Sequence, residues 1–237
     1  MDWRWKVRSM FLKLGYDVHK TDAQEIIVRG QYTRSQHYGY LTYSPWFEDW
    51  FQEIYCKIKD HTIVTEDRCY IIHRFCKQCL HLEGDFAECG VYRGGTAFLI
   101  AHTLSSNSID DKKIHLFDTF TGMPATAEEE DTGFKKGDFG DNSLDAVNDY
   151  LRPFSLVSLH PGVIPVTFEE VEDRRFAFVH IDVDLYQTTI DCCNFFYERM
   201  PSGGVMIFDD YGFMYFQRSE KRAVDEFFND KPEVPIS

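Results

Sequence analysis

The stretch that decides the fold runs Phe178-Val179-His180-Ile181-Asp182-Val183-Asp184-Leu185-Tyr186, an apolar segment that ends in carboxylates. A second stretch has the same design and reads Gly203-Gly204-Val205-Met206-Ile207-Phe208-Asp209-Asp210-Tyr211-Gly212. Short apolar runs of this kind are typical of strands buried in a parallel sheet. Because ligands of open α/β sheets bind at the carboxyl ends of the strands, we expect Asp182, Asp209 and Asp210 to face one crevice.

Carboxylates that share a crevice repel one another, so one of them takes up a proton unless a cation lies among them. A hard ion that prefers oxygen ligands, such as Mg²⁺, meets that need. Two neighbours remain open in role. Asp184 alternates onto the same face as Asp182 but could instead brace the following turn, and His180 could simply pack within the strand.

The rest of the chain alternates strands with helices. Strands are expected at residues 84–89, 114–118, 157–160, 176–183 and 204–209, and helices at 62–82, 96–104, 143–151, 188–199 and 221–229. This alternation predicts an α/β fold, a Rossmann-like, doubly wound and mostly parallel sheet. A chain of 237 residues can form one such domain, which we expect over residues 61–237 after an N-terminal extension over residues 1–60.

The extension is helical and aromatic in pattern, and it allows several interpretations. One helical face carries Trp3, Val7, Met10, Phe11 and Leu14. It could dock on the chain's own domain, form a homodimer interface or lie on a membrane surface. The aromatic residues of 31–55 could form a lid over an acceptor, or Trp46, Phe47, Trp50 and Phe51 could be the buried stripe of a helix that starts near Ser44-Pro45. Residues 128–142 are a second candidate lid.

Composition excludes several classes of protein. The net charge of −14 argues against a nucleic-acid partner, which requires a basic face. No apolar stretch reaches the roughly 20 residues of a transmembrane helix. Seven cysteines, an odd number, indicate free thiols and a reducing cytoplasm rather than a disulfide framework. Cys76 and Cys79 form a C-x-x-C pattern, but the spacing of Cys69, His73 and Cys76 favours the packed face of a helix over a zinc site.

A glycine turn, Glu88-Cys89-Gly90-Val91-Tyr92-Arg93-Gly94-Gly95-Thr96, joins the first strand of the domain to its helix. Such a turn lets the backbone approach a ligand closely. Glu88 at the strand end would repel a pyrophosphate and attract a cationic ligand, so S-adenosylmethionine, with its sulfonium and amino groups, suits the turn better than NAD. Asp118 closes the second strand, where an acidic residue commonly binds ribose hydroxyls, although it could also cap the turn that follows.

These segments, in this order and spacing, resemble the macrocin O-methyltransferase (TylF/MycF/NovP) family. The resemblance covers about residues 62–228 and is carried by residues 84–95, 116–124, 180–186, 208–212 and 223–227. It implies a class I S-adenosylmethionine-dependent methyltransferase fold and Mg²⁺-assisted methylation of a sugar hydroxyl. It further implies that the cofactor contacts are Glu88, Gly90, Tyr92, Thr96, Asp118 and Phe120, and that the metal ligands are Asp182, Asp209 and Asp210.

The resemblance also assigns the catalytic base. The broader catechol-methyltransferase group carries a lysine base at the position of Leu185, so here the resemblance favours Asp182 as base. Two departures stand out: residues 218–222 differ from the family's usual segment, and the chain stops where relatives continue into a last strand. The sugar-containing acceptor stays open as a small molecule or a glycan. A nicotinamide-dependent oxidoreductase and a non-catalytic cofactor-binding module are the alternatives.

Overall fold

The structure is a computed structural model that describes residues 32–34, 41–124 and 134–236. The chain divides into two units, Met1–Gln52 and Glu53–Ser237, each considered by itself. The expected domain boundary at residue 60 stays a prediction. The expected docking helix near Trp3 and residues 128–133 of the second candidate lid lie outside the described residues. Within the described part of the chain, none of the helices combines the length and the apolar character that crossing a bilayer demands.

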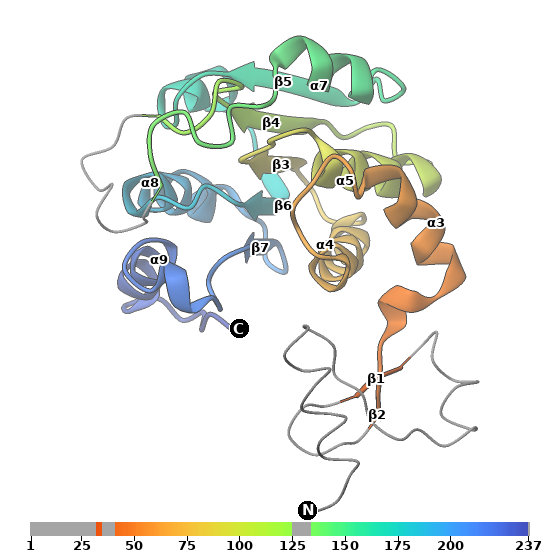
Figure 1. Ribbon diagram of the computed structural model, residues 1–237. Coiled ribbons are helices and arrows are strands. Elements are labelled where there is room, and N and C mark those ends of the chain that lie inside the picture. The colour runs from red at the N-terminus through yellow and green to blue at the C-terminus, as the bar shows by residue number, and fades with distance from the viewer. Residues whose placement is uncertain (1–31, 35–40, 125–133, 237) are drawn as a thin grey trace, which may run out of the picture. The chain divides into compact units, whose positions relative to one another are not determined.

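A five-stranded sheet forms the centre of the second unit (Figure 1). The strands are β3 (Asp85–Cys89), β4 (Ile114–Asp118), β5 (Val157–Pro161), β6 (Phe176–Ile181) and β7 (Val205–Phe208). All neighbouring strands pair in parallel, in the order β5-β4-β3-β6-β7. The doubly wound parallel sheet that the apolar runs predict is therefore confirmed, and every residue of β3 and β6 is buried.

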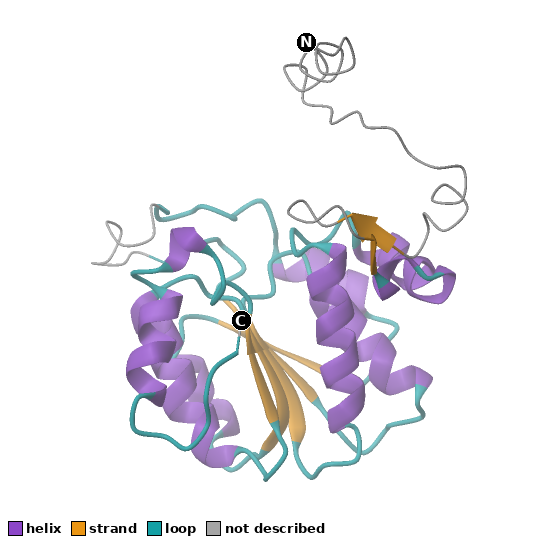
Figure 2. Ribbon diagram, turned by 90° about the horizontal axis from the view of Figure 1, so that it is seen from below, coloured by secondary structure: helices purple, strands orange, loops and turns teal. Residues whose placement is uncertain are grey.

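Helices cover both faces of this sheet (Figure 2). The pair α4 (Glu66–Cys79) and α5 (Gly95–Ser106) packs together, and so does the pair α8 (Tyr186–Phe196) and α9 (Glu220–Phe228). The helix α7 (Leu144–Leu151) contacts β5, and the Ser143 hydroxyl caps it by accepting the Ala146 N–H at 3.2 Å. Short 3-10 helices occur at η2 (Val166–Val171), η3 (Tyr197–Arg199) and η4 (Met214–Phe216).

The core beneath the site is largely aromatic. The rings of Phe176 and Phe196 meet edge to face at 4.9 Å between centroids, and those of Phe117 and Phe168 do so at 5.0 Å. Edge-to-face pairs of this kind add to the hydrophobic stabilisation of burial. The sheet that carries the site is thus anchored to α8 by rigid side chains.

The helix ends differ from expectation in places. α4 is shorter than residues 62–82, because Thr62 and Val64 belong to a turn in which the Thr62 hydroxyl accepts the Val64 N–H. Its packed face is as predicted: Cys69, His73 and Cys76 are all buried. Among the described residues, the groups that could hold a metal ion consist of His180 and aspartates.

The described part of the first unit contains the antiparallel strands β1 (Tyr32–Arg34) and β2 (Leu41–Tyr43), the 3-10 helix η1 (Pro45–Phe47) and the start of α3 (Asp49–Ile58). The helix near Ser44-Pro45 therefore begins as a 3-10 turn. Phe51 is buried, whereas Trp50 is 38% exposed, so not all of the aromatic residues predicted to form a buried stripe are buried.

Candidate active site

A cavity of about 220 Å³ opens where the carboxyl ends of β3, β4, β6 and β7 meet. Most of the predicted site residues line it: Gly90, Tyr92, Thr96, Asp118, Asp182, Asp209 and Asp210. The apolar part of its wall includes Val91, Met123, Val163 and Ile164. As the carboxyl-end rule for open α/β sheets led us to expect, Asp182, Asp209 and Asp210 face one cavity.

Gly90 fixes how the glycine turn passes the end of β6. Its φ is +85°, and a Cβ at this position would collide with the backbone oxygen of Asp182. Only glycine combines this left-handed conformation with so close an approach. The Gly90 N–H donates to the Phe117 carbonyl at 2.9 Å, and the Asp182 N–H donates to the Cys89 carbonyl at 2.8 Å. The turn and the first predicted metal ligand are therefore held together by backbone.

Asp118 organises the same turn from the neighbouring strand. One carboxylate oxygen accepts the N–H groups of Val91 at 2.7 Å and Tyr92 at 2.9 Å, and the other accepts the Phe120 N–H at 2.7 Å. Both expected roles are compatible with this geometry, because a carboxylate has about four acceptor positions and one remains for a ribose hydroxyl. The Phe120 ring is buried and does not line the cavity. Phe120 therefore contributes its backbone N–H, and not its ring, to the surroundings of Asp118.

Glu88, like Phe120, does not line the cavity, unlike the other predicted cofactor residues. Its side chain is fully buried, and its Oε1 lies 2.8 Å from Nδ1 of His180, which is directly opposite in the β3–β6 register. Its Oε2 has no hydrogen-bond partner within the described residues. Glu88 therefore contacts the interior of the sheet rather than the cavity, and its predicted cofactor contact stays untested.

His180 is more than a packed strand residue. Its Nε2 lies 3.5 Å from a carboxylate oxygen of Asp209, so the imidazole bridges Glu88 and Asp209 inside the sheet. Burial alone would lower the pKa of His180, but its hydrogen bonds to Asp209 and Glu88 raise that pKa well above its ordinary value. The two carboxylates thus favour the protonated form of this buried imidazole.

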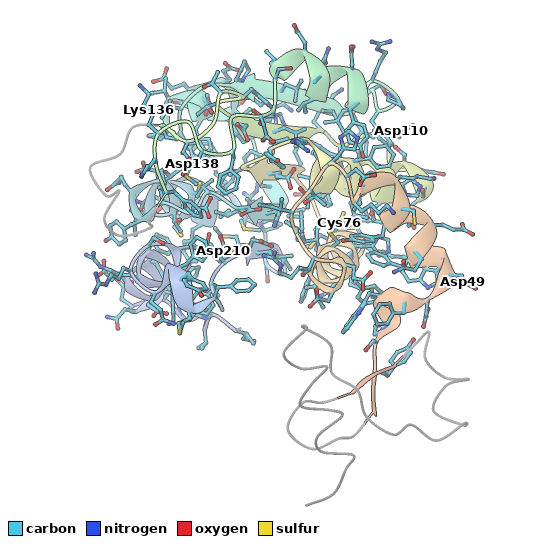
Figure 3. The ribbon with its side chains drawn as sticks, viewed as in Figure 1. Asp49, Cys76, Asp110, Lys136, Asp138 and Asp210 are labelled. Carbon is cyan, nitrogen blue, oxygen red and sulfur yellow. The ribbon has the colours of Figure 1, made fainter. Side chains whose placement is uncertain are left out.

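The acidic residues fall into two overlapping groups. Ligand atoms of Asp182, Asp184 and Asp210 lie within 4.8 Å of one another, and so do those of His180, Asp182 and Asp209. The predicted trio of Asp182, Asp209 and Asp210 shares the cavity but does not form one such group. Figure 3 shows Asp210 beside α9.

The electrostatics of these groups suit a cation. Burial, followed by the charge of Asp209, raises the pKa of Asp182 well above its usual range. Burial and the neighbouring Asp182 do the same to the pKa of Asp184, whose side chain is hydrogen-bonded to Asp210. Asp184 adopts a φ of +60°, a conformation that aspartate tolerates better than most residues. Clustered oxygen donors that resist ionisation form a donor set that a hard divalent cation fits.

Two site residues escaped the sequence reasoning. Glu220, at the start of α9, is fully buried, and its Oε1 accepts the Asp210 N–H at 2.8 Å. It belongs to the segment 218–222 that departs from the family pattern, which was the available signal. Arg68 on α4 pairs with Asp209 from across the cavity. No local pattern connects residues so far apart in the chain.

The described end of the second candidate lid touches the glycine turn. The Tyr92 hydroxyl donates to Asp141 at 3.2 Å, and the Asn142 amide donates to the Tyr92 carbonyl at 2.7 Å. Phe139 meets the Tyr92 ring edge to face, with 6.1 Å between centroids. Phe134, Phe139 and Asn142 of this segment line the cavity, whereas a lid movement stays a prediction.

The sequence pattern of the family described as Macrocin-O-methyltransferase (TylF) matches residues 49–234. The chain therefore belongs to this family, as the resemblance implied.

Individual relatives agree. The chain is 30% identical over 157 residues to demethyldecarbamoylnovobiocin O-methyltransferase of Streptomyces niveus, covering 62% of this chain and 59% of the relative. It is 26% identical over 165 residues to mycinamicin III 3''-O-methyltransferase of Micromonospora griseorubida, covering 64% of this chain and 65% of the relative. The matches thus span somewhat more than half the length of these curated relatives.

The fold is shared with solved structures. The O-methyltransferase NovP superimposes with a TM-score of 0.65 at 25% identity, over 75% of this chain and 78% of that one. The calicheamicin methyltransferase CalS11 gives a TM-score of 0.59 at 15% identity over 93% of this chain and 97% of that one, which demonstrates a common fold only. The fold is therefore that of the class I methyltransferases.

Proposed function

We propose that this chain is an S-adenosylmethionine-dependent, Mg²⁺-assisted O-methyltransferase that acts on a sugar hydroxyl. The observation that carries the proposal is one cavity in which an acidic cluster lies directly against a glycine turn and Asp118. The names of the relatives support it, since they describe O-methyltransferases, one of them acting on mycinamicin III. Family membership favours this activity over the nicotinamide-dependent oxidoreductase.

The cavity fits both groups that the family implies. Asp118 retains an acceptor position for a ribose hydroxyl, and the apolar wall of Val91 and Ile164 suits an adenine ring. Asp182, Asp209 and Asp210 would hold the metal ion, with Asp184 as a further oxygen donor within reach of Asp182 and Asp210. When bound, S-adenosylmethionine supplies an electrophilic methyl group and Mg²⁺ supplies a Lewis acid that makes a hydroxyl more acidic.

The chain's own residues supply position and proton transfer. We assign Asp182 as the general base that accepts the acceptor's hydroxyl proton on a carboxylate oxygen, because its side chain lies in the cavity among the residues proposed to hold the metal ion that would bind this hydroxyl. Gly90 keeps the turn in contact with the backbone of Asp182, so the base and the cofactor wall keep a fixed separation. The apolar wall limits access of water, which could otherwise accept the methyl group.

Further features of the proposal concern setting and assembly. All seven cysteines carry free thiols, which supports a reducing, cytoplasmic compartment. A homodimer through the N-terminal segment stays a prediction. The acceptor could be a small glycoside or a glycan.

The test measures formation of S-adenosylhomocysteine with a panel of glycosides, in Mg²⁺ and in excess EDTA. Asp182→Asn should reduce turnover by at least about 100-fold while S-adenosylmethionine binds nearly as in the wild type. Asp173→Asn, which changes an exposed carboxylate whose side chain is 89% accessible, is the matched control and should keep full activity. Unchanged turnover of Asp182→Asn, or of the wild type in EDTA, would refute the metal-assisted mechanism; cofactor binding without turnover or any metal effect would favour the non-catalytic module.

A further inference from the structure

Arg68 is a cation built into the wall of the acidic cavity. It lies in the first turn of α4, and its side chain is 25% exposed. Among the described residues that line the cavity, it is the sole lysine or arginine. A guanidinium is always charged at physiological pH and presents a planar set of donors that matches carboxylates.

The guanidinium is held from several directions. Its Nη1 pairs with one carboxylate oxygen of Asp209 and lies 3.8 Å from an oxygen of Asp210. Its Nε donates to the Thr65 hydroxyl at 3.2 Å, and its carbon lies 4.9 Å from the ring centroid of Phe213. These contacts fix the charge at the end of β7, so it is not a freely moving surface arginine.

Both oxygens of Asp209 lie next to a nitrogen-bearing side chain of the protein. One pairs with Arg68, and the other lies 3.5 Å from the imidazole of His180. The carboxylates of Asp182, Asp184 and Asp210, in contrast, lie within 4.8 Å of one another. Arg68 thus lies beside two of the three residues proposed to hold the metal ion, Asp209 and Asp210.

We infer that Arg68 is a positioning residue that competes with the divalent cation for Asp209 and Asp210, and so sets the metal affinity of the site. The inference rests on the proposed metal-assisted function. An ion that takes up the oxygens of Asp209 and Asp210 must weaken their pairing with Arg68. By linkage, a guanidinium that stabilises these carboxylates in the metal-free protein lowers metal affinity by the same free energy.

Removal of the Arg68 charge should have two linked effects, one on stability and one on metal affinity. Without Arg68, the carboxylates of the metal-free protein still lie close together, but no guanidinium offsets their mutual repulsion, so the protein becomes less stable. The same loss makes metal binding more favourable, because the ion no longer displaces a competitor. A residue that merely braced α4 against the end of β7 would behave differently, since its removal would loosen the site and weaken metal binding.

The experiment titrates Mg²⁺ calorimetrically into the full-length wild type, Arg68→Met and Arg68→Lys, with melting temperatures in EDTA as a second measurement. Arg68→Met should bind Mg²⁺ more tightly, on the order of ten-fold, which is the effect of removing one partly screened charge at this range. It should melt at a lower temperature than the wild type in EDTA. Arg68→Lys keeps the charge but loses the planar fork, so its affinity should lie between the two.

Arg152→Met is the matched control, because Arg152 is an exposed arginine paired with one carboxylate, Asp149, on α7. It should leave Mg²⁺ affinity unchanged. Equal or weaker Mg²⁺ binding by Arg68→Met would overturn the inference, and if that variant does not fold, wild-type affinity in Arg68→Lys would do so. Absence of Mg²⁺ binding in both the wild type and the variants would instead refute the proposed metal site itself.

Discussion

Replacing Asp118 by asparagine should destabilise the fold as well as the cofactor site. The Asp118 carboxylate accepts three backbone N–H groups, those of Val91, Tyr92 and Phe120, at 2.7 to 2.9 Å. An asparagine can keep its single oxygen for Val91 and Tyr92, which share one carboxylate oxygen of Asp118, but its amide NH₂ would then point at the Phe120 N–H. The variant therefore loses one charge-assisted hydrogen bond, brings one donor against another, and keeps the other two bonds without the charge.

Each hydrogen bond to a charged group contributes about 1.5–3 kcal/mol, and the half-buried position of Asp118 favours the lower value. Asp118→Asn should thus lower the free energy of unfolding by about 2.5 kcal/mol in urea denaturation, from one lost hydrogen bond and two that lose their charge. Asp138→Asn is the control, because the exposed Asp138 carboxylate accepts a single backbone N–H, from Lys135 at 2.8 Å, and should lose less than about 1 kcal/mol. Equal losses in the two variants would refute the argument. Such a result would mean that the Asp118 carboxylate does not stabilise the turn and serves only to bind a ligand.

Two further predictions concern stability. Gly90→Ala should lower the free energy of unfolding in urea by more than about 2 kcal/mol, because the added methyl group would collide with the Asp182 backbone. Gly137→Ala is the control: Gly137 has a φ of +89° but open space around it, so the substitution adds only conformational strain of about 1 kcal/mol. Equal losses in the two variants would contradict the predicted collision. Burial, followed by the charge of Lys77, lowers the pKa of His73 from 6.5 to about 4, so the unfolded chain binds the extra proton between these pH values and stability falls as pH drops through that window. The wild type should therefore lose roughly 2 kcal/mol more than His73→Leu between pH 7 and pH 5, and parallel pH profiles would show this interpretation to be wrong.

The sheet and the location of the cavity could be predicted because both follow from local patterns. Mainly apolar runs such as Phe176–Ile181, in which His180 is the one polar residue, form strands buried on both faces, and carboxylates at their ends then gather at one edge. Gly90 was equally readable, since a glycine between strand and helix signals a close backbone approach. These features depend on neighbours within a few residues.

The pairings inside the site could not be predicted in the same way. Arg68 reaches Asp209 across 141 positions of sequence, and only the packing of α4 against β6 and β7 brings them together. Glu88 was expected at the cofactor, yet the register that sets it opposite His180 turns its carboxylate into the sheet. Regular strand alternation predicts only that Asp184 lies on the same face of the sheet as Asp182. The left-handed backbone of Asp184, at φ +60°, instead directs its carboxylate toward Asp210.

The central claim is that the cavity at the carboxyl ends of β3, β4, β6 and β7 binds S-adenosylmethionine. Calorimetric titration of S-adenosylmethionine into the wild-type chain tests it without knowledge of the acceptor. The account predicts one site per chain with micromolar affinity, retained by the control Asp138→Asn and weakened in Asp118→Asn. A folded wild type that shows no binding would contradict the cofactor assignment and, with it, the proposed function.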